Sequence, residues 1–430
     1  MILLALARLR RLARQVALGL LAAAVLNAPA SYLNVAAEQE HVPVPTPAVL
    51  SESAVLAAYC SEAAEIAGAT VPWAGKAPSA TAATTLALED RWLTEDPYRY
   101  NHGLARACAV LAAVCNSESR FYSTPDGSPF AEGALGALGF SDVHTGSYAL
   151  RSRVLDELGA LLTGQHAVAA YTLAHKEVPG DHGAETVILM GIRGSYGTEW
   201  LSNFDLGEEG DHRGFELAEQ EALEALRLYA RSIGAQPDRT RVLLCGHSRG
   251  GAVANLLAAD LNRLSATPEA LTGPSAVYAY TFAAPACTRS PERDDGLHGN
   301  VFNVVDAEDV VPRWPLEGWG FGRYGVTVQL PCAEGLGPVT ARALAAAMER
   351  NAGTALTMGQ GRCNRDALDA LEEALEPLGP GLPLPDLAAP ARALEAVLQL
   401  DPLAALVAHL PDAYIAKLQC LEPQQLAFER

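Results

Sequence analysis

The segment 246–250, Gly-His-Ser-Arg-Gly, constrains the fold of this chain more than any other feature. An apolar run, 242–245, precedes it, and a run of small and apolar residues, 251–257, follows it. This order is typical of a strand, a sharp turn and a helix, with the serine hydroxyl held outward at the turn. Glycine is needed two residues before and two residues after the serine, because a Cβ at either place would strike the neighbouring strand or helix. Ser248 is therefore a candidate nucleophile.

Strand-like and helix-like patterns alternate through the middle of the chain, which indicates a largely parallel sheet covered on both faces. The expected strands are 168–173, 186–192, 241–245, 276–282 and 300–305, and the helices among them are 215–233 and 252–264. Further helices are expected over 53–67, 101–115, 154–162, 339–350, 365–375 and 390–400. We predict the α/β class and an α/β-hydrolase fold: a mostly parallel central sheet flanked by helices, with an N-terminal helical leader and a C-terminal helical extension.

The chain divides into four expected parts. Arginines precede the apolar stretch 16–26 and small residues follow it, so residues 1–30 have the form of a signal peptide for secretion. An uncleaved, membrane-anchoring segment is the alternative. Residues 31–96 are expected to be a linker or helical leader, 97–332 the α/β-hydrolase core, and 333–430 a C-terminal helical segment that carries a candidate catalytic histidine.

Charge and cysteine pattern exclude several classes of partner. The formal net charge of −19 argues against nucleic acid and against a strongly anionic membrane surface. The eight cysteines form no C-x-x-C pair and no cluster with histidine, so neither a metal nor a cofactor is expected. Export would permit disulfides, and Cys332 with Cys363 is our first candidate pair.

Chain order selects the partners of Ser248. In α/β hydrolases the nucleophile is followed by an acid and then by a histidine. Of the ten histidines only His409 lies beyond the candidate acids, so it is the expected base. Asp309 is followed by an apolar, proline-containing turn that would bury a carboxylate, and Asp306 is its competitor. The oxyanion hole needs two backbone N–H groups, for which we expect Arg249, after the nucleophile, and Ser195, in the glycine turn after the strand 186–192.

Several motifs together resemble the lipase class 3 family, the α/β hydrolases that include the fungal triacylglycerol lipases. The motifs, in chain order, are Arg193-Gly194-Ser195 followed by Trp200, His212-x-Gly214-Phe215, the elbow 246–252, the strand 280–285, and Asp309-Val310-Val311-Pro312-x-x-Pro315. The resemblance covers about residues 97–330. Two features depart from it. The family has an aspartate shortly after the tryptophan that supports the oxyanion residue, and here Asn203 and Asp205 are both candidates for that place. Residues 333–400 match no part of the pattern.

The resemblance implies a secreted serine esterase or lipase that cleaves lipid esters through an acyl-serine intermediate. It implies Asp309 rather than Asp306 as the acid, Ser195 in the oxyanion hole and a structural role for His212. The expected partners are a small-molecule or lipid ester and, transiently, a lipid interface. Other interpretations remain open. A peptidase, a thioesterase or a polyester hydrolase would share the fold, and a secreted binding module would share it without turnover.

Overall fold

The computed structural model describes residues 46–64, 81–121, 129–146, 148, 169–180, 183–194, 213–332, 335–352, 363–378 and 388–429. The expected signal segment, 1–30, and the expected helix 154–162 lie outside these residues. No helix within the described ranges combines the length and the apolar character that a bilayer crossing requires. The expected domain boundaries remain predictions.

In the described part of the chain, eight strands form the central sheet in the order β11-β10-β9-β8-β7-β6-β5-β4. Their bounds are Ser141–Gly146 (β4), Tyr171–Gly180 (β5), Gly183–Ile192 (β6), Thr240–His247 (β7), Val277–Phe282 (β8), Val301–Asp306 (β9), Val326–Leu330 (β10) and Ala427–Glu429 (β11). Strands β6 to β10 run parallel to one another, whereas β4, β5 and β11 add antiparallel pairs at the two edges. This mostly parallel sheet confirms the predicted α/β-hydrolase fold.

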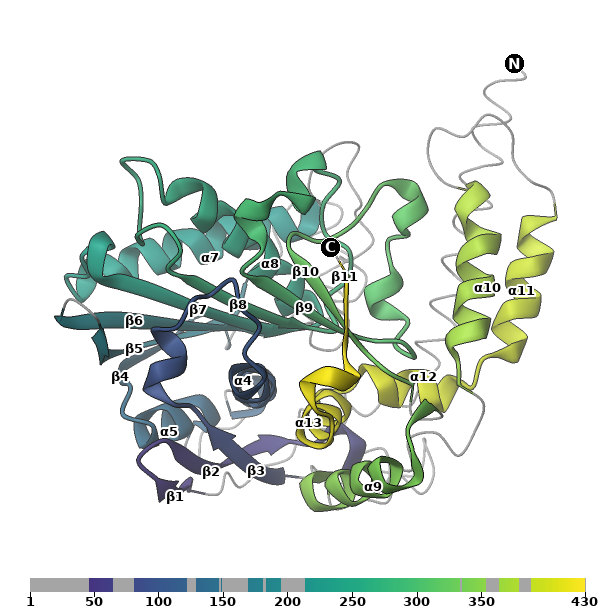
Figure 1. The fold of residues 1–430 in the computed structure, drawn as a ribbon, viewed down its shortest axis with the longest axis horizontal. Helices are drawn as coiled ribbons and strands as arrows, with labels where there is room; N and C mark the ends of the chain where they lie inside the picture. The colour runs from purple at the N-terminus through teal and green to yellow at the C-terminus, as the bar shows by residue number, and fades with distance from the viewer. Residues whose placement is uncertain are drawn as a thin grey trace.

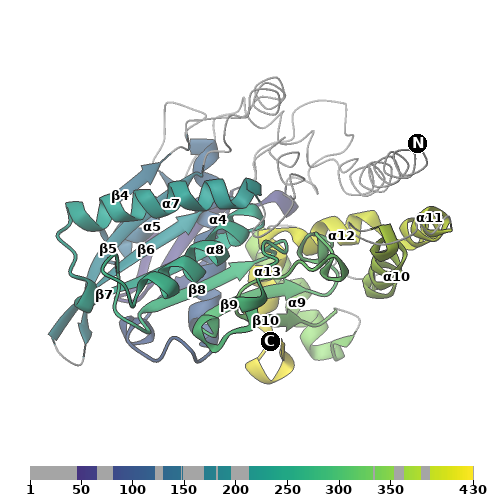
Figure 2. The same ribbon diagram turned by 90° about the horizontal axis from the view of Figure 1, so that it is seen from above.

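Helices cover both faces of the sheet (Figure 1). Helices α7 (Arg213–Ser232) and α8 (Arg249–Leu264) lie on one face, and α4 (His102–Phe121), α5 (Phe130–Ala137) and α13 (Pro411–Cys420) lie on the other. Every residue of β8 and of β9 is buried, as expected for parallel strands enclosed on two sides. Seen from above, α7 and α8 run across the sheet, while α10 (Arg365–Leu375) and α11 (Ala389–Gln399) stand to one side of it (Figure 2).

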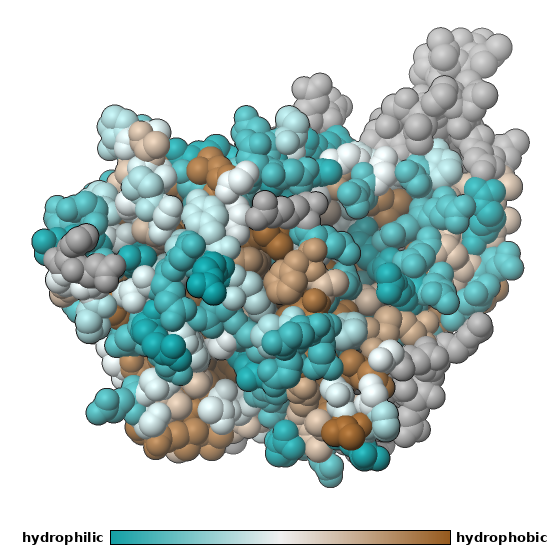
Figure 3. Space-filling view, viewed as in Figure 1, coloured by the Kyte–Doolittle hydropathy of each residue, from teal (hydrophilic) through white to brown (hydrophobic). Residues whose placement is uncertain are grey.

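A second, three-stranded antiparallel sheet lies beyond α4 and α5. Its strands are β1 (Ala48–Ser51), β2 (Ala54–Cys60) and β3 (Thr81–Ala87), in that order. The prediction of a helix over 53–67 is therefore wrong over Ala54–Cys60, which form strand β2. Alanine favours a helix locally, but β2 pairs with β3 along its whole length and buries Val55, Ala57 and Tyr59 against α4, so tertiary pairing overrides the propensity. Figure 3 shows a mostly hydrophilic face, with apolar side chains gathered at its lower edge, where this sheet lies in Figure 1.

The C-terminal part is helical, as expected, and adds one strand. After β10 come α9 (Pro338–Ala352), α10, α11, α12 (Pro402–His409) and α13, and β11 then pairs with β10. Helices α10 and α11 pack on the loop that follows β9 through an apolar cluster that includes Val310, Trp314 and Leu371. Arg313 in this loop forms an ion pair with Asp369 of α10, at 2.6 Å.

Helix α13 holds a lysine with no exposure to solvent. Lys417 Nζ lies 2.6 Å from Asp306 Oδ2 and 3.8 Å from Glu308 Oε2, and it donates a hydrogen bond of 3.0 Å to the carbonyl oxygen of Pro331. A buried ammonium is stable only when it is paired in this way. The ion pair therefore joins α13 to the carboxyl end of β9.

We predict that Lys417→Met lowers the free energy of unfolding by about 3–5 kcal/mol, because removing one partner leaves a buried carboxylate without a counter-charge. Urea denaturation followed by circular dichroism measures this loss. Adding Asp306→Asn should recover part of it, since a neutral amide needs no counter-charge. A single variant as stable as the parent chain would contradict this account.

Candidate active site

Ser248 lies at a strained corner between β7 and α8. Its backbone φ is 54° and its ψ is −127°, a conformation with positive φ that costs energy for any residue with a Cβ. The Ser248 N–H donates to the Phe282 carbonyl, at 2.8 Å, which ties the corner to β8. A Cβ on Gly246 would overlap the carbonyl oxygen of Gly250, and one on Gly250 would overlap that of Ile192. Both glycines are therefore required by the close approach of backbone, as the sequence predicts.

The structure brings the expected base and acid to this corner. Ser248 Oγ donates to His409 Nε2 at 3.1 Å, and His409 Nδ1 donates to Asp309 Oδ2 at 2.9 Å and to Oδ1 at 3.1 Å. A carboxylate only accepts hydrogen bonds, so Nδ1 carries the proton and Nε2 is left to accept. Asp309 is fully buried, and the other two side chains are nearly so. The three groups form one hydrogen-bonded chain from hydroxyl to imidazole to carboxylate.

The competing acid, Asp306, lies elsewhere. Its carboxylate pairs with Lys417, and burial raises its pKa to about 6 against the opposing effect of that ammonium. Asp309 instead accepts from the backbone N–H of Val311, at 2.9 Å, and from His409. The turn after β9 thus directs one acid to the helix α13 and the other to the histidine.

Two further side chains contact these three groups, and neither was assigned a role from the sequence. The Tyr414 hydroxyl donates to Asp309 Oδ2 at 2.8 Å and accepts from the Asp306 N–H at 3.1 Å. His247 Nε2–H donates to the backbone carbonyl of His409 at 2.7 Å. Burial, and then the neighbouring His409, lower the pKa of His247 well below its ordinary value, so its imidazole is neutral. His247 stood inside the motif 246–250, whereas nothing in the sequence pattern marked Tyr414.

The expected oxyanion hole is described only in part. Arg249 is the first residue of α8 and directly follows Ser248, so its backbone N–H lies at the helix N-terminus, where negative charge is favoured. The other expected donor and the remaining motif residues that precede α7 lie outside the described residues: Ser195, Trp200, Asn203, Asp205 and His212.

The turn that leads to Ser195 is described as far as Gly194. The Gly194 N–H donates to Asn116 Oδ1 at 2.8 Å. A Cβ on Gly194 would come within 2.8 Å of the backbone carbonyl oxygen of His247. The residue before Ser195 therefore lies directly beside the elbow.

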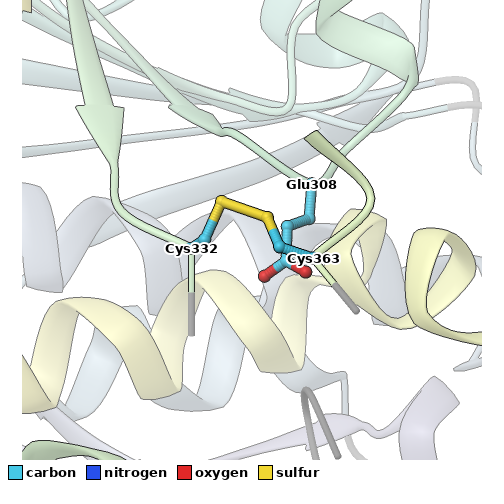
Figure 4. A group of neighbouring side chains, drawn as sticks. All are labelled: Glu308, Cys332 and Cys363. Carbon is cyan, nitrogen blue, oxygen red and sulfur yellow. A yellow bond between two sulfur atoms is a disulfide. The ribbon is translucent and has the colours of Figure 1, made fainter. Parts of the chain in front are cut away.

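A disulfide joins the segment after β10 to the start of α10. It links Cys332 to Cys363, which confirms the expected pair, and the Glu308 carboxylate lies beside it (Figure 4). Among the described side chains, these three are the group whose ligand atoms come close enough for a metal ion, within 4.8 Å of one another. Metals bind the thiolate form of cysteine, and neither bonded sulfur is a thiolate. We therefore interpret this group as a covalent link between elements.

Part of the chain matches a known family. Residues 190–319 match the sequence model of the class 3 lipases, so the resemblance seen in the motifs is confirmed over that segment. Class 3 lipases are ester hydrolases. The segment contains the elbow and Asp309, whereas His409 lies beyond it. No curated protein sequence matches the chain.

Solved lipase structures align with parts of the chain. One, described as a triacylglycerol lipase with a serine protease triad as its catalytic centre, is 22% identical over 38% of this chain and 62% of its own, with a TM-score of 0.29. The alignment thus spans less than two thirds of that lipase. The Rhizomucor miehei lipase propeptide complex is 19% identical over 53% of this chain and 67% of its own, with a TM-score of 0.35. The lipase of Rhizopus microsporus var. chinensis is 16% identical over 54% of this chain and 76% of its own, with a TM-score of 0.36. Because these TM-scores are below 0.5, the fold assignment rests on the strand order.

We predict that Gly250→Ala lowers the melting temperature by several degrees, because the new Cβ overlaps backbone that cannot move without distorting β6. Differential scanning calorimetry measures the change. Gly136→Ala in α5 is the matched control: nothing lies within 4 Å of its Cβ, and alanine favours a helix, so its melting temperature should stay level or rise. Equal effects of the two changes would contradict the steric argument.

Proposed function

We propose that this chain is a secreted serine hydrolase that cleaves carboxylic esters of lipids, with Ser248, His409 and Asp309 as its catalytic triad. The observation that carries the proposal is the hydrogen-bonded chain from Ser248 Oγ through His409 to Asp309, at 3.1 Å and 2.9 Å. A serine on a strained corner, a histidine within reach and a carboxylate behind it are the parts that acyl transfer requires. The match of residues 190–319 to the class 3 lipases supports an ester as the substrate class.

The proposed reaction has two steps. Ser248 Oγ attacks the acyl carbon while His409 Nε2 takes the hydroxyl proton, and the Asp309 carboxylate stabilises the imidazolium that forms. When the tetrahedral intermediate collapses, the bond to the leaving alcohol breaks and Nε2–H protonates that alcohol. Water then attacks the acyl-serine with the same base, which releases the carboxylic acid and restores the serine.

The proposed oxyanion hole uses the N–H of Arg249 and the N–H of Ser195. Support for Arg249 comes from its place at the start of α8, directly after the nucleophile. Support for Ser195 comes from its described neighbour Gly194, which lies against the backbone of His247. Asn116 Oδ1 accepts a hydrogen bond from the Gly194 N–H, which would orient the backbone that leads to Ser195.

Export is part of the proposal. The arginines and the apolar stretch of residues 1–30 have the form of a secretory signal. The Cys332–Cys363 disulfide supports an oxidising compartment, since disulfides persist mainly outside the cytosol.

We predict that Ser248→Ala lowers the rate of p-nitrophenyl ester hydrolysis at least about a thousandfold, and that His409→Ala causes a comparable loss, because triad members act as a unit. A series of acyl chain lengths then defines the preferred ester. A fluorophosphonate probe should label the parent chain and leave the Ser248→Ala chain unlabelled. Equal hydrolysis by the parent chain and Ser248→Ala would contradict the proposed function.

We predict a smaller loss, about tenfold or more in kcat/KM, for Tyr414→Phe, because a hydrogen bond to a charged group contributes about 1.5–3 kcal/mol. This change removes the hydroxyl that holds Asp309 and keeps the ring. Tyr324→Phe is the control, because Tyr324 is comparably buried and its hydroxyl contacts Thr288, not the triad. Steady-state kinetics on the same ester measures both; an unchanged kcat/KM for Tyr414→Phe would argue against its role.

A further inference from the structure

The first turn of α13 contains a buried carboxylate that is bound by donors from the N-terminal part of the chain. Asp412 has no exposure to solvent. Its Oδ1 accepts from the Tyr59 hydroxyl at 3.0 Å and from the Ser61 hydroxyl at 2.7 Å, and its Oδ2 accepts from the Ala63 N–H at 3.3 Å. These three donors lie on β2 and on the residues directly after it.

The Asp412 carboxylate is fixed by hydrogen bonds from uncharged donors, which act only in a particular geometry. Burial raises the pKa of Asp412, while the hydrogen bonds from Ser61 and Tyr59 act in the opposite sense. The N-terminus of a helix also favours a negative charge. Because a buried carboxylate is costly unless its oxygens are satisfied, the first turn of α13 has one favourable position relative to β2.

That position is transmitted to His409 over a short and stiff connection. His409 is the last residue of α12, and α13 begins at Pro411, so Leu410 alone separates the two helices. Proline restricts the backbone at the start of α13. The Ala413 N–H donates to the Leu410 carbonyl at 3.0 Å, which closes the turn. A shift of Asp412 would therefore move His409 with it.

We infer that Tyr59, Ser61 and Asp412 are positioning residues for His409, so that the three-stranded sheet β1-β2-β3 helps to hold the proposed active site in place. This inference rests on the proposed function. Strand β2 is fixed for this role, because it pairs with β1 and β3 and packs against α4. The three donors lie well before the segment 190–319 that matches the class 3 lipases. They are therefore a feature of this chain outside the matched family segment.

The test compares kcat and KM for a soluble p-nitrophenyl ester in Tyr59→Phe, Ser61→Ala and the double variant. A displacement of a catalytic group by about 1 Å costs on the order of a hundredfold in rate. We expect kcat to fall about tenfold in each single variant and further in the double variant, with KM within about twofold of the parent chain. Asp412→Asn, which keeps one acceptor oxygen, should retain more activity than Asp412→Ala.

Thr84→Val is the matched control. Thr84 is on β3 of the same small sheet, and its hydroxyl accepts from Gln419 Nε2, at 2.9 Å, in the last turn of the same helix. It also donates to Asn351 at 3.2 Å. Its loss should lower the melting temperature about as much as Tyr59→Phe does, yet leave kcat unchanged, because the contact lies at the far end of α13 from His409.

Two results would overturn the inference: parent-like kcat in both Tyr59→Phe and Ser61→Ala, or a loss of kcat in Thr84→Val equal to theirs. Ser248→Ala in the same assay separates this outcome from a failure of the proposed function. If Ser248→Ala matches the parent chain, the function itself is wrong and the inference falls with it.

Discussion

The burial of α13 is the constraint on which the arrangement of the site depends. A helix that is enclosed on all sides must satisfy each polar group that it carries, and every residue from Pro411 to Leu418 is buried. Lys417 pairs with Asp306, and Tyr414 donates to Asp309. Arg106 of α4 donates to the carbonyl of Leu418 at 2.7 Å, near the end of the helix. These contacts reach different parts of the fold, so together they define one orientation of α13.

The parallel sheet supplies the other half of the arrangement. Strands β7 and β9 run in the same direction on either side of β8, so the residues that follow them, Ser248 and Asp309, emerge at the same edge. The carboxyl ends of parallel strands are where α/β proteins place their sites. His409 comes from the C-terminal part of the chain. It is the last residue of α12 and lies between Ser248 and Asp309.

Much of the fold could be predicted from the sequence, and what was missed shares a physical cause. The helices α7, α8 and α10 have strong local periodicity, and their expected bounds lie within a few residues of those observed. Strand β10 has five residues and β11 has three, so their local pattern is short, and the two strands pair with each other. Strand β2 was expected to be helical because its alanines favour a helix, and its pairing with β3 could not be predicted from local sequence.

The sequence by itself determined the elbow and the order of its partners. Close backbone contact requires glycine at 246 and 250 whatever lies further away, and chain order left His409 as the one histidine beyond the acids. Chain order alone left Asp306 and Asp309 open as the acid. Only the tertiary structure brings Asp309 to that histidine and adds the hydrogen bonds from Tyr414 to Asp309 and from His247 to the backbone of His409. The reason is the range of the interactions. The turn at Ser248 is determined by steric contacts among residues close in the sequence. The Asp309–His409 and Tyr59–Asp412 hydrogen bonds instead join residues 100 and 353 positions apart. Their geometry exists only after the sheet and helices have packed.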